Sequence, residues 1–250
     1  MASQTEGGRL PVTSYNVASW GNPVGAGAMG SFYITVSGIA KAAIPSEPFA
    51  VANEVICGEL ARVLRLPIPP GFIVTDPKGK PHHTSLNFNL SGQNLPPANC
   101  PAILSQKPWE AAGTIIFDIW VANSDRHNGN LAFDNRTNEM MLFDHSHAFM
   151  RGVQGQQRLA NVTNSLGINQ PTKHCLGSII QSTDHFFEWS ERVRQIPEFC
   201  IRGAVEYAAQ VGLPNADVQF CVDFLMNRQN KLMPLVHNSR GEFPNVQYWP

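Results

Sequence analysis

The side chains best suited to chemistry lie in one polar stretch near the middle of the chain, residues 123–149, which reads NSDRHNGNLAFDNRTNEMMLFDHSHAF. Asp125 precedes Asn130 by five positions, and Asp144 lies fourteen positions beyond Asn130. Phosphoryl transfer needs a carboxylate that accepts or orients the attacking hydroxyl, and it needs a neutral and an anionic oxygen ligand for Mg²⁺. We therefore expect Asp125 to act as the catalytic base and Asn130 and Asp144 to bind Mg²⁺.

The residues between these side chains predict how they come together. LAF and MMLF read as two strands of a hairpin, joined by the polar turn DNRTNE. Such a hairpin returns Asp144 to the side of Asn130, so that both face one cation. The alternative is structural, because Asp125, Asn128 and Asn130 are also the kind of residues that satisfy the backbone of a turn. His145 and His147 flank this position, and we expect them to form a turn rather than a zinc site.

A glycine motif lies near the start of the chain, in GAGAMGSFYITV. Gly25, Gly27 and Gly30 spell G-x-G-x-x-G, and the absence of a Cβ lets backbone N–H groups approach phosphate oxygens. Residues 32–36 then alternate apolar and polar, which predicts a strand. A dinucleotide-binding fingerprint requires a helix at that point. A glycine loop between two strands is instead the arrangement that covers ATP phosphates in kinase-like folds.

Periodicity predicts the elements that must position these motifs. Apolar residues at helical spacing predict a helix over residues 48–66, ended by PIPPG and followed by the strand FIVTD. A second helix is predicted over residues 108–123, and residues 176–236 read as mainly helical with breaks near Pro197 and Pro214.

Residues 77–102 are dense in Gly, Pro, Asn and Ser, which predicts a long loop or linker between two lobes. His82 and His83 lie in this segment. No further ligand stands at a suitable spacing, so we expect the pair to be solvated rather than to bind a metal.

Composition excludes several classes of protein. With 250 residues, 43% of them hydrophobic, the chain is long enough for one large domain or two lobes. A net charge of −1 and 15% charged residues give no field for nucleic acid, so no direct nucleic-acid partner is expected. The first residues lack the apolar core of a secretory signal and no long apolar run follows, so we expect a cytoplasmic protein without membrane insertion. The five cysteines form no C-x-x-C pair.

The central motif resembles the catalytic core of the HipA-like kinases. FDIWVANSDRHNGNLAF followed by LFDHSHAF carries the resemblance, which extends upstream through NEVICGELARVLRLPIPPGFIV and downstream to FLMNRQNKLMPLV. These atypical bacterial serine/threonine kinases share a similar loop with phosphatidylinositol kinases. The resemblance implies an α+β, bilobed kinase fold with a small β-rich N-lobe and a mainly helical C-lobe. We expect residues 1–16 to be a flexible leader, 17–107 the N-lobe, 108–240 the C-lobe and 241–250 a tail.

The same resemblance implies a role for each motif residue. Asp125 matches the catalytic aspartate, Asn130 the metal-binding asparagine and Asp144 the aspartate of the DFG type. Glu54 matches the helix glutamate that pairs with an ATP-positioning lysine. His127 completes the loop motif and either contacts the transferring phosphate or braces the loop.

The lysine itself is where the sequence departs from the family. The family carries it in the strand after the glycine loop, and Val36 stands at that position here. Lys41 is the nearest lysine and lies beyond this strand. Either Lys41 folds back toward Glu54 and serves the phosphates, or it is a solvated loop residue and nucleotide alignment is weakened.

Three functions follow from these expectations. The first is an ATP- and Mg²⁺-dependent kinase that phosphorylates a serine or threonine hydroxyl of a protein. The second is a catalytically weak pseudokinase that senses nucleotide or binds a partner. The third is a phosphatidylinositol-type lipid kinase, which DRHNGN suggests, although no basic loop for the headgroup is present. The family resemblance also implies a small antitoxin-type partner.

Overall fold

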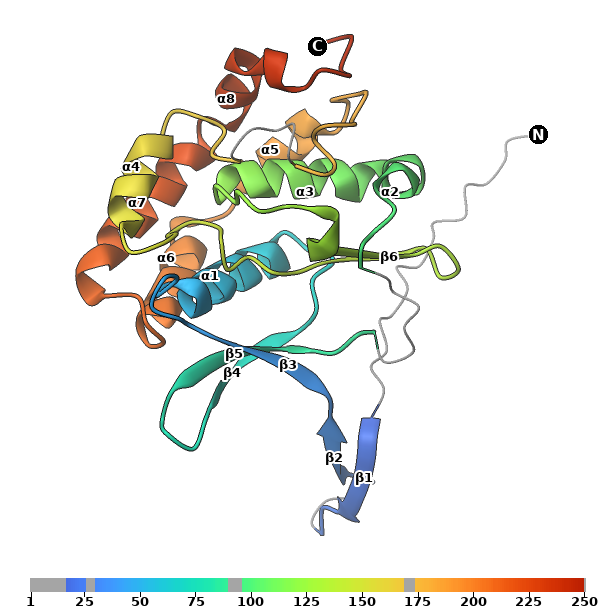
Figure 1. Ribbon diagram of the computed structural model, residues 1–250, viewed down its shortest axis with the longest axis vertical. Coiled ribbons are helices and arrows are strands. Elements are labelled where there is room, and N and C mark those ends of the chain that lie inside the picture. The colour runs from blue at the N-terminus through green and yellow to red at the C-terminus, as the bar shows by residue number, and fades with distance from the viewer. Residues whose placement is uncertain (1–16, 26–29, 90–95, 169–173, 250) are drawn as a thin grey trace.

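The computed structural model describes residues 17–25, 30–89, 96–168 and 174–249, and these form a strand-rich part and a helical part (Figure 1). The predicted leader lies outside the described residues. The strands are β1 (Val17–Pro23), β2 (Phe32–Val36), β3 (Gly38–Ala42), β4 (Gly71–Thr75), β5 (Pro81–Leu86), β6 (Leu131–Asp134) and β7 (Glu139–Leu142). The helices are α1 (Ala50–Val63), α2 (Cys100–Gln106), α3 (Pro108–Trp120), α4 (Gly155–Val162), α5 (Phe186–Arg194), α6 (Glu198–Ala209), α7 (Val218–Gln229) and α8 (Leu232–Asn238).

A three-stranded antiparallel sheet in the order β3-β5-β4 forms the centre of the strand-rich part. Its middle strand, β5, lies within residues 77–102, so the prediction of a loop throughout that segment is wrong. The sequence of β5, PHHTSL, contains no apolar run that would reveal a strand. The segment is a strand because its backbone pairs with both β3 and β4. His83 of β5 pairs with Lys41 of β3 on one side and with Ile73 of β4 on the other, so it is a strand residue rather than a loop residue.

Helix α1 lies between this sheet and the helical part (Figure 1). It contacts all three strands of the sheet and also packs against α6, so that most of its residues are buried. The helix ends where Arg65 adopts a positive φ of 58°. Leu66 then precedes a proline, a position that disfavours the helical conformation. The helix predicted over residues 48–66 is confirmed within these bounds.

The helical part is built around α3. Ile115, Ile116, Ile119 and Trp120 of this helix are fully buried, and α3 packs against α5, α7 and α8. The helix predicted over residues 108–123 and the mainly helical stretch predicted over residues 176–236 are confirmed. Helix α5 begins only at Phe186, and Pro197 occupies the position just before α6. After residue 240 the chain returns to this core through Phe243, whose ring lies 5.9 Å from that of Phe186.

The hairpin of β1 and β2 projects away from the rest of the molecule (Figure 1). Every residue of β2 is exposed to solvent. Gly25 and Gly30 border the turn of this hairpin, as the glycine motif predicts, and Gly27 lies outside the described residues.

Two negative findings concern the described residues. None of their helices combines the length and the apolar character needed to cross a bilayer. All five cysteines are free thiols.

Candidate active site

Lys41 brings the two parts of the molecule together. Its Nζ lies 2.8 Å from Oε1 of Glu54 on α1 and 2.5 Å from Oδ1 of Asp144, which follows β7. The expectation that Val36 stands in the place of this lysine is wrong. Val36 ends β2 in the projecting hairpin, and Ser37 separates β2 from β3. Strand β3 pairs with β5 instead of continuing the hairpin, and this pairing places Lys41 against α1.

Glu54 holds two segments with its two carboxylate oxygens. Oε1 accepts from Lys41, and Oε2 accepts from the backbone N–H of His145 at 3.1 Å. Burial alone would raise the pKa of Glu54, but the hydrogen bond from His145 and the charge of Lys41 hold that pKa well below its usual range. Glu54 is therefore an anion that fixes the Lys41 ammonium.

Asn53, next to Glu54 on α1, binds the chain just after Asp144. Its Nδ2 donates to the carbonyl oxygens of Ser146 at 2.9 Å and Met150 at 2.7 Å, and its Oδ1 accepts from Met150 N–H at 3.1 Å. Because Asn53 is fully buried, these bonds replace all of its contact with water. Helix α1 thus positions both flanks of the turn that carries Asp144.

Asp144 occupies a left-handed backbone conformation with a φ of 60°. Aspartate tolerates this region better than most residues. Its Oδ1 accepts from Ser146 Oγ at 2.6 Å as well as from Lys41. Burial opposes ionisation, but the charge of Lys41 lowers the pKa of Asp144, and the two carboxylates in turn raise the pKa of Lys41 against the effect of its own burial.

The β6–β7 hairpin is present as predicted and joins Asn130 to the segment of Asp144. Leu131 pairs with Leu142, and Phe143 N–H donates to the carbonyl oxygen of Asn130 at 3.3 Å. The Asn130 Nδ2 donates to the carbonyl oxygen of Asp125 at 2.9 Å, so its amide oxygen points away from that residue. The structure therefore gathers Asp125, Asn130 and Asp144 in one region.

The carboxylate of Asp125 is partly exposed, as a group that receives a hydroxyl must be. His147 Nδ1 lies 3.4 Å from Asp125 Oδ2, without the alignment of a hydrogen bond. His127 is more exposed, and its Nδ1 accepts from Gly129 N–H at 3.0 Å. His127 thus braces the loop in this structure, while a contact with a phosphate stays a prediction.

Arg126, which belongs to the loop motif DRH but received no role from the sequence, lies at the centre of the site. It is buried and donates to Asp118 twice, to the carbonyl oxygens of Asn130 and Phe143 at 2.7 Å each, and to His145 Nε2 at 2.8 Å. Because arginine only donates, His145 Nε2 must accept, and the ring proton sits on Nδ1 facing Glu54. One guanidinium thus holds the loop of Asp125, the end of β7 and the turn after Asp144.

Asp118 completes this network from within α3. It is fully buried and also binds His174 Nε2 at 3.1 Å, while His174 Nδ1 accepts from backbone N–H groups. Burial would raise the pKa of Asp118, but Arg126 and His174 keep that pKa well below its usual range. The sequence held one signal for this residue, since an aspartate in the middle of the apolar run IIFDIW needs a buried partner.

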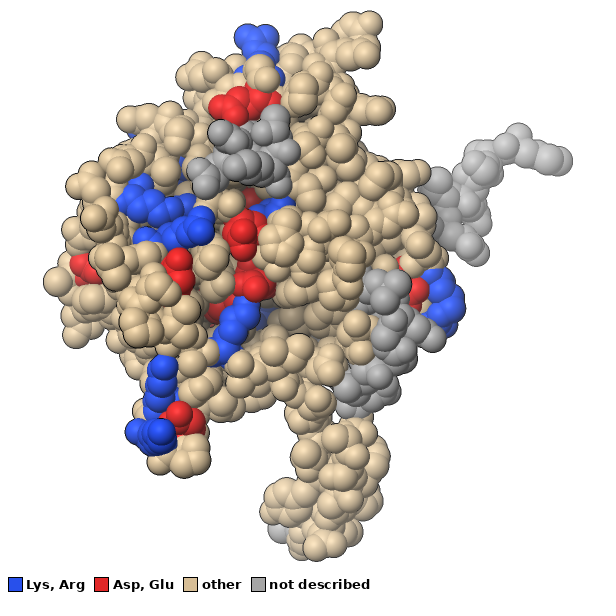
Figure 2. Space-filling view, in the orientation of Figure 1, with Lys and Arg blue, Asp and Glu red and all other residues tan. Residues whose placement is uncertain are grey.

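A cavity of about 370 Å³ lies beside Lys41, Glu54 and Asp144. Its volume falls in the usual range for small-molecule sites, and its walls combine these charged groups with apolar side chains. The apolar lining comes mainly from Ile39, Ile68, Phe88, Leu142 and Phe143. In the view of Figure 2, acidic and basic side chains meet near the middle of the molecule, while much of the remaining surface is uncharged.

The donor set of this site fits a nucleotide with Mg²⁺. An amide oxygen of Asn130 and a carboxylate oxygen of Asp144 are hard ligands, and Mg²⁺ takes its other oxygens from phosphates and water. Lys41 adds a cation for the phosphates. Of the motif, Gly25 and Gly30 lie within the described residues, and neither of them lines the cavity.

Comparison with known proteins supports this arrangement. Residues 105–198, which contain Asp125, Asn130 and Asp144, match a family model described as HipA-like kinase. The chain is also similar in structure to the proinflammatory kinase CtkA of Helicobacter pylori, with a TM-score of 0.55 and 14% sequence identity over 90% of this chain and 96% of that chain. No curated protein matches the chain. The resemblance to HipA-like kinases and the α+β, bilobed kinase-like fold expected from the sequence are confirmed.

Proposed function

We propose that the chain is an ATP- and Mg²⁺-dependent kinase that transfers the γ-phosphoryl group to a serine or threonine hydroxyl of a protein. The observation that carries this proposal is the contact of Lys41 with both Glu54 and Asp144 at the nucleotide-sized cavity. A partly buried cation beside two carboxylates is a costly arrangement to build. In kinases the ion pair between the corresponding lysine and the helix glutamate holds the lysine that aligns the nucleotide phosphates, and the second carboxylate binds Mg²⁺.

The nucleotide side of the site divides its work among four residues. ATP bound with Mg²⁺ supplies an electrophilic phosphoryl group and a good leaving group. Lys41 holds the phosphates, and Glu54 keeps the Lys41 ammonium in place. Asn130 and Asp144 offer the protein oxygens for the metal.

The acceptor side depends on Asp125. Its partly exposed carboxylate accepts the proton of the attacking hydroxyl and orients that hydroxyl toward the phosphate. Arg126 touches neither reactant. It is a positioning residue, because its bonds to Asn130 and Phe143 fix the distance between the base and the metal ligands.

The pseudokinase alternative depended on a missing lysine. The position of Lys41 next to Glu54 argues against this alternative. A protein acceptor and a small antitoxin-type partner stay predictions.

Two substitutions test the proposal. Asp125→Asn is expected to keep ATP·Mg²⁺ binding and to lower transfer by at least about a hundredfold, because it removes only the base. Asp144→Asn is expected to weaken the binding of ATP·Mg²⁺ itself. Binding is measured by calorimetry and by the thermal shift that ligand binding produces, and transfer by labelled ATP with cell lysate as acceptor.

The matched control is Asp223→Asn, which changes an exposed aspartate on α7. It is expected to change neither readout. If ATP with Mg²⁺ fails to stabilise the folded wild-type chain, or if both site variants lose binding equally, the roles assigned to the two aspartates are wrong.

A further inference from the structure

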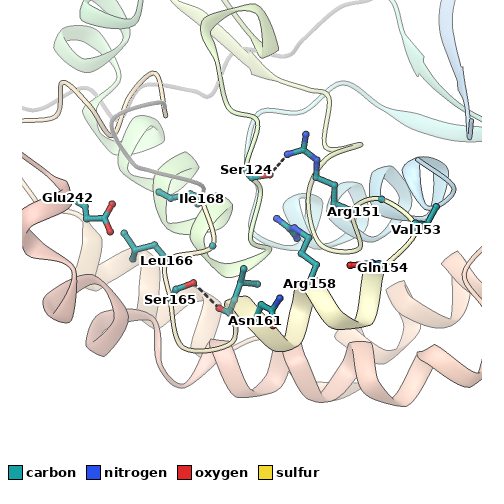
Figure 3. Close-up of a pocket in the computed structure, with 13 residues that line it drawn as sticks. Ser124, Arg151, Val153, Gln154, Arg158, Asn161, Ser165, Leu166, Ile168 and Glu242 are labelled. Atoms are coloured by element: carbon teal, nitrogen blue, oxygen red, sulfur yellow. Dashed lines mark hydrogen bonds between the residues drawn. The ribbon is translucent and has the colours of Figure 1, made fainter. Parts of the chain in front are cut away.

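A second cavity, of about 660 Å³, begins at Ser124, the residue before Asp125. In the part of the chain that the structure describes, it shares no lining residue with the nucleotide cavity. From Ser124 it runs past α4 and the segment 165–168 toward Glu242 (Figure 3). If ATP occupies the first cavity and Asp125 is the base, this second cavity lies where the acceptor must approach.

Two arginines face the end of this cavity that lies nearest Asp125. Arg151 Nη1 donates to Ser124 Oγ at 3.0 Å, and Arg158 donates to the carbonyl oxygens of Ala122, at 2.5 Å, and Phe149. Figure 3 shows the two guanidinium groups close together beside Ser124, with Glu242 at the opposite end. The cavity is therefore positive at the end near the base.

The charge of this arginine pair is only partly neutralised. Glu47 Oε1 lies 3.7 Å from Arg151 Nε and 3.8 Å from His147 Nε2. The other oxygen of this carboxylate, Oε2, accepts a hydrogen bond from the Gly152 N–H at 2.9 Å. Across the described residues, no carboxylate pairs with Arg158, whose two acceptors are carbonyl oxygens. Burial, together with the charge of Arg151, lowers the pKa of Arg158 to about 10. An anion in the cavity would relieve this repulsion.

We propose that this cavity binds an acidic side chain of the protein acceptor, close in sequence to the hydroxyl that Asp125 receives. The inference rests on the proposed kinase function. A guanidinium offers parallel N–H groups that match a carboxylate, and Arg151 reaches the cavity from the same wall as Ser124.

The remaining walls favour a peptide over a phosphorylated lipid headgroup. Gln154, Asn161, Leu166 and Ile168 are neutral, and no lysine lines the cavity within the described residues. Two arginines suit a single carboxylate, whereas a headgroup with several phosphates needs more cations. The volume leaves room for neighbouring residues of an extended segment beside the acidic one.

Peptide binding to the full chain tests the proposal without any need for catalysis. The probes are two fluorescein-labelled peptides with a central serine, one flanked by glutamates and the other by glutamines. Fluorescence anisotropy is expected to show about tenfold tighter binding of the glutamate peptide, because a hydrogen bond to a charged group is stronger than a neutral one. The preference is expected to weaken as salt is added.

Arg151→Gln is expected to abolish this preference and to leave the thermal unfolding midpoint and the binding of ATP·Mg²⁺ unchanged. Arg151 is the better target, since Arg158 also supports the backbone through two carbonyl groups. Arg194→Gln on α5, which removes an exposed arginine, is the matched control and is expected to keep the preference. Arg151→Glu is expected to reverse it toward a lysine-flanked peptide.

Three outcomes would overturn the proposal. They are equal binding of the two peptides by the wild-type chain, a preference that survives in Arg151→Gln, and Arg151-dependent binding to vesicles of phosphatidylinositol phosphate without any peptide preference. A glutamate preference in a chain that transfers no phosphate would instead support charge recognition by the cavity while contradicting the proposed kinase function.

Discussion

The guanidinium of Arg126 binds both carboxylate oxygens of Asp118, with Nε 2.8 Å from Oδ2 and Nη2 3.1 Å from Oδ1, and neither side chain is exposed to solvent. The same guanidinium binds the carbonyl oxygens of Asn130 and Phe143, which flank the β6–β7 hairpin. An ion pair in the core of the helical part therefore sets the geometry of the candidate active site.

Breaking this ion pair is expected to destabilise the whole chain. Asp118→Asn leaves Arg126 charged, buried and without a counterion, and such a change typically costs about 3–5 kcal/mol of unfolding free energy. Urea unfolding followed by tryptophan fluorescence measures the change. Glu191→Gln, which removes an exposed carboxylate paired with Arg194, is the control and is expected to leave the midpoint unchanged. Equal midpoints for the two variants would show that the buried pair is not structural.

Acid should unfold the chain through two buried carboxylates. The pKa values of Asp118 and Glu54 are lowered in the folded chain, so the unfolded chain binds protons first as the pH falls. Their contribution to stability is complete above the pKa values that the two carboxyl groups have in the unfolded chain, about 4, and it is lost progressively at lower pH. The urea midpoint is expected to stay flat from about pH 8 to pH 5 and to fall steeply below about pH 4.

The variant Asp118→Asn provides the control for this pH dependence. It lacks one of the two titrating carboxylates, so its stability should fall less steeply with acid than that of the wild-type chain. Parallel slopes for the two proteins would mean that other carboxylates govern acid unfolding.

The position of Lys41 predicts opposite results for two substitutions. Lys41→Ala is expected to lower phosphoryl transfer at least tenfold, or by about 1.4 kcal/mol of transition-state stabilisation. Val36→Lys is expected to change nothing, because Val36 lies in the projecting hairpin. Initial rates at saturating and limiting ATP measure both effects, with Lys78→Ala in the β4–β5 turn as the control. Recovery of activity in the double variant Lys41→Ala/Val36→Lys would contradict this assignment.

Two helical glycines should respond to alanine with opposite signs. Alanine is a better helix former than glycine by up to about 1 kcal/mol. A Cβ added at Gly203 in α6 meets nothing within 4 Å, so Gly203→Ala should raise the unfolding free energy. A Cβ at Gly113 in α3 would lie 2.4 Å from the ring of Trp189, so Gly113→Ala should lower it by about 1–3 kcal/mol. Chemical unfolding of both variants decides the signs, and a stabilised Gly113→Ala would show that α3 and α5 separate easily.

Elements with a strong local pattern could be predicted from the sequence. The apolar spacing in α1 and α3 and the paired runs on either side of DNRTNE specify their own conformation. The spacing of Asp125, Asn130 and Asp144 was visible for the same reason, since the hairpin between them is local. This local hairpin is enough to bring Asp144 back to Asn130, without any contact between distant parts of the sequence.

Elements that depend on distant partners could not be predicted. The strand β5 is polar, and only its pairing with β3 and β4 makes it a strand. Lys41 seemed misplaced because FYITVSGIAKA looks like one strand that ends too early, whereas β2 and β3 belong to different sheets. The contact of Asp118 with His174 joins residues far apart in the chain, and no spacing rule reveals it.

Asn53 and Glu54 are neighbours on α1, and this adjacency connects the helix to both parts of the molecule. Asn53 fastens α1 to the chain after Asp144, while Glu54 meets the sheet through the ammonium of Lys41. Helix α1 is therefore tied by hydrogen bonds to the chain after Asp144 and by an ion pair to the sheet, and it also packs against all three strands of that sheet. Withdrawing Lys41 from the site would therefore break its contacts with both Glu54 and Asp144. If the proposed nucleotide binds there, its phosphates would compete with these two carboxylates for the Lys41 ammonium.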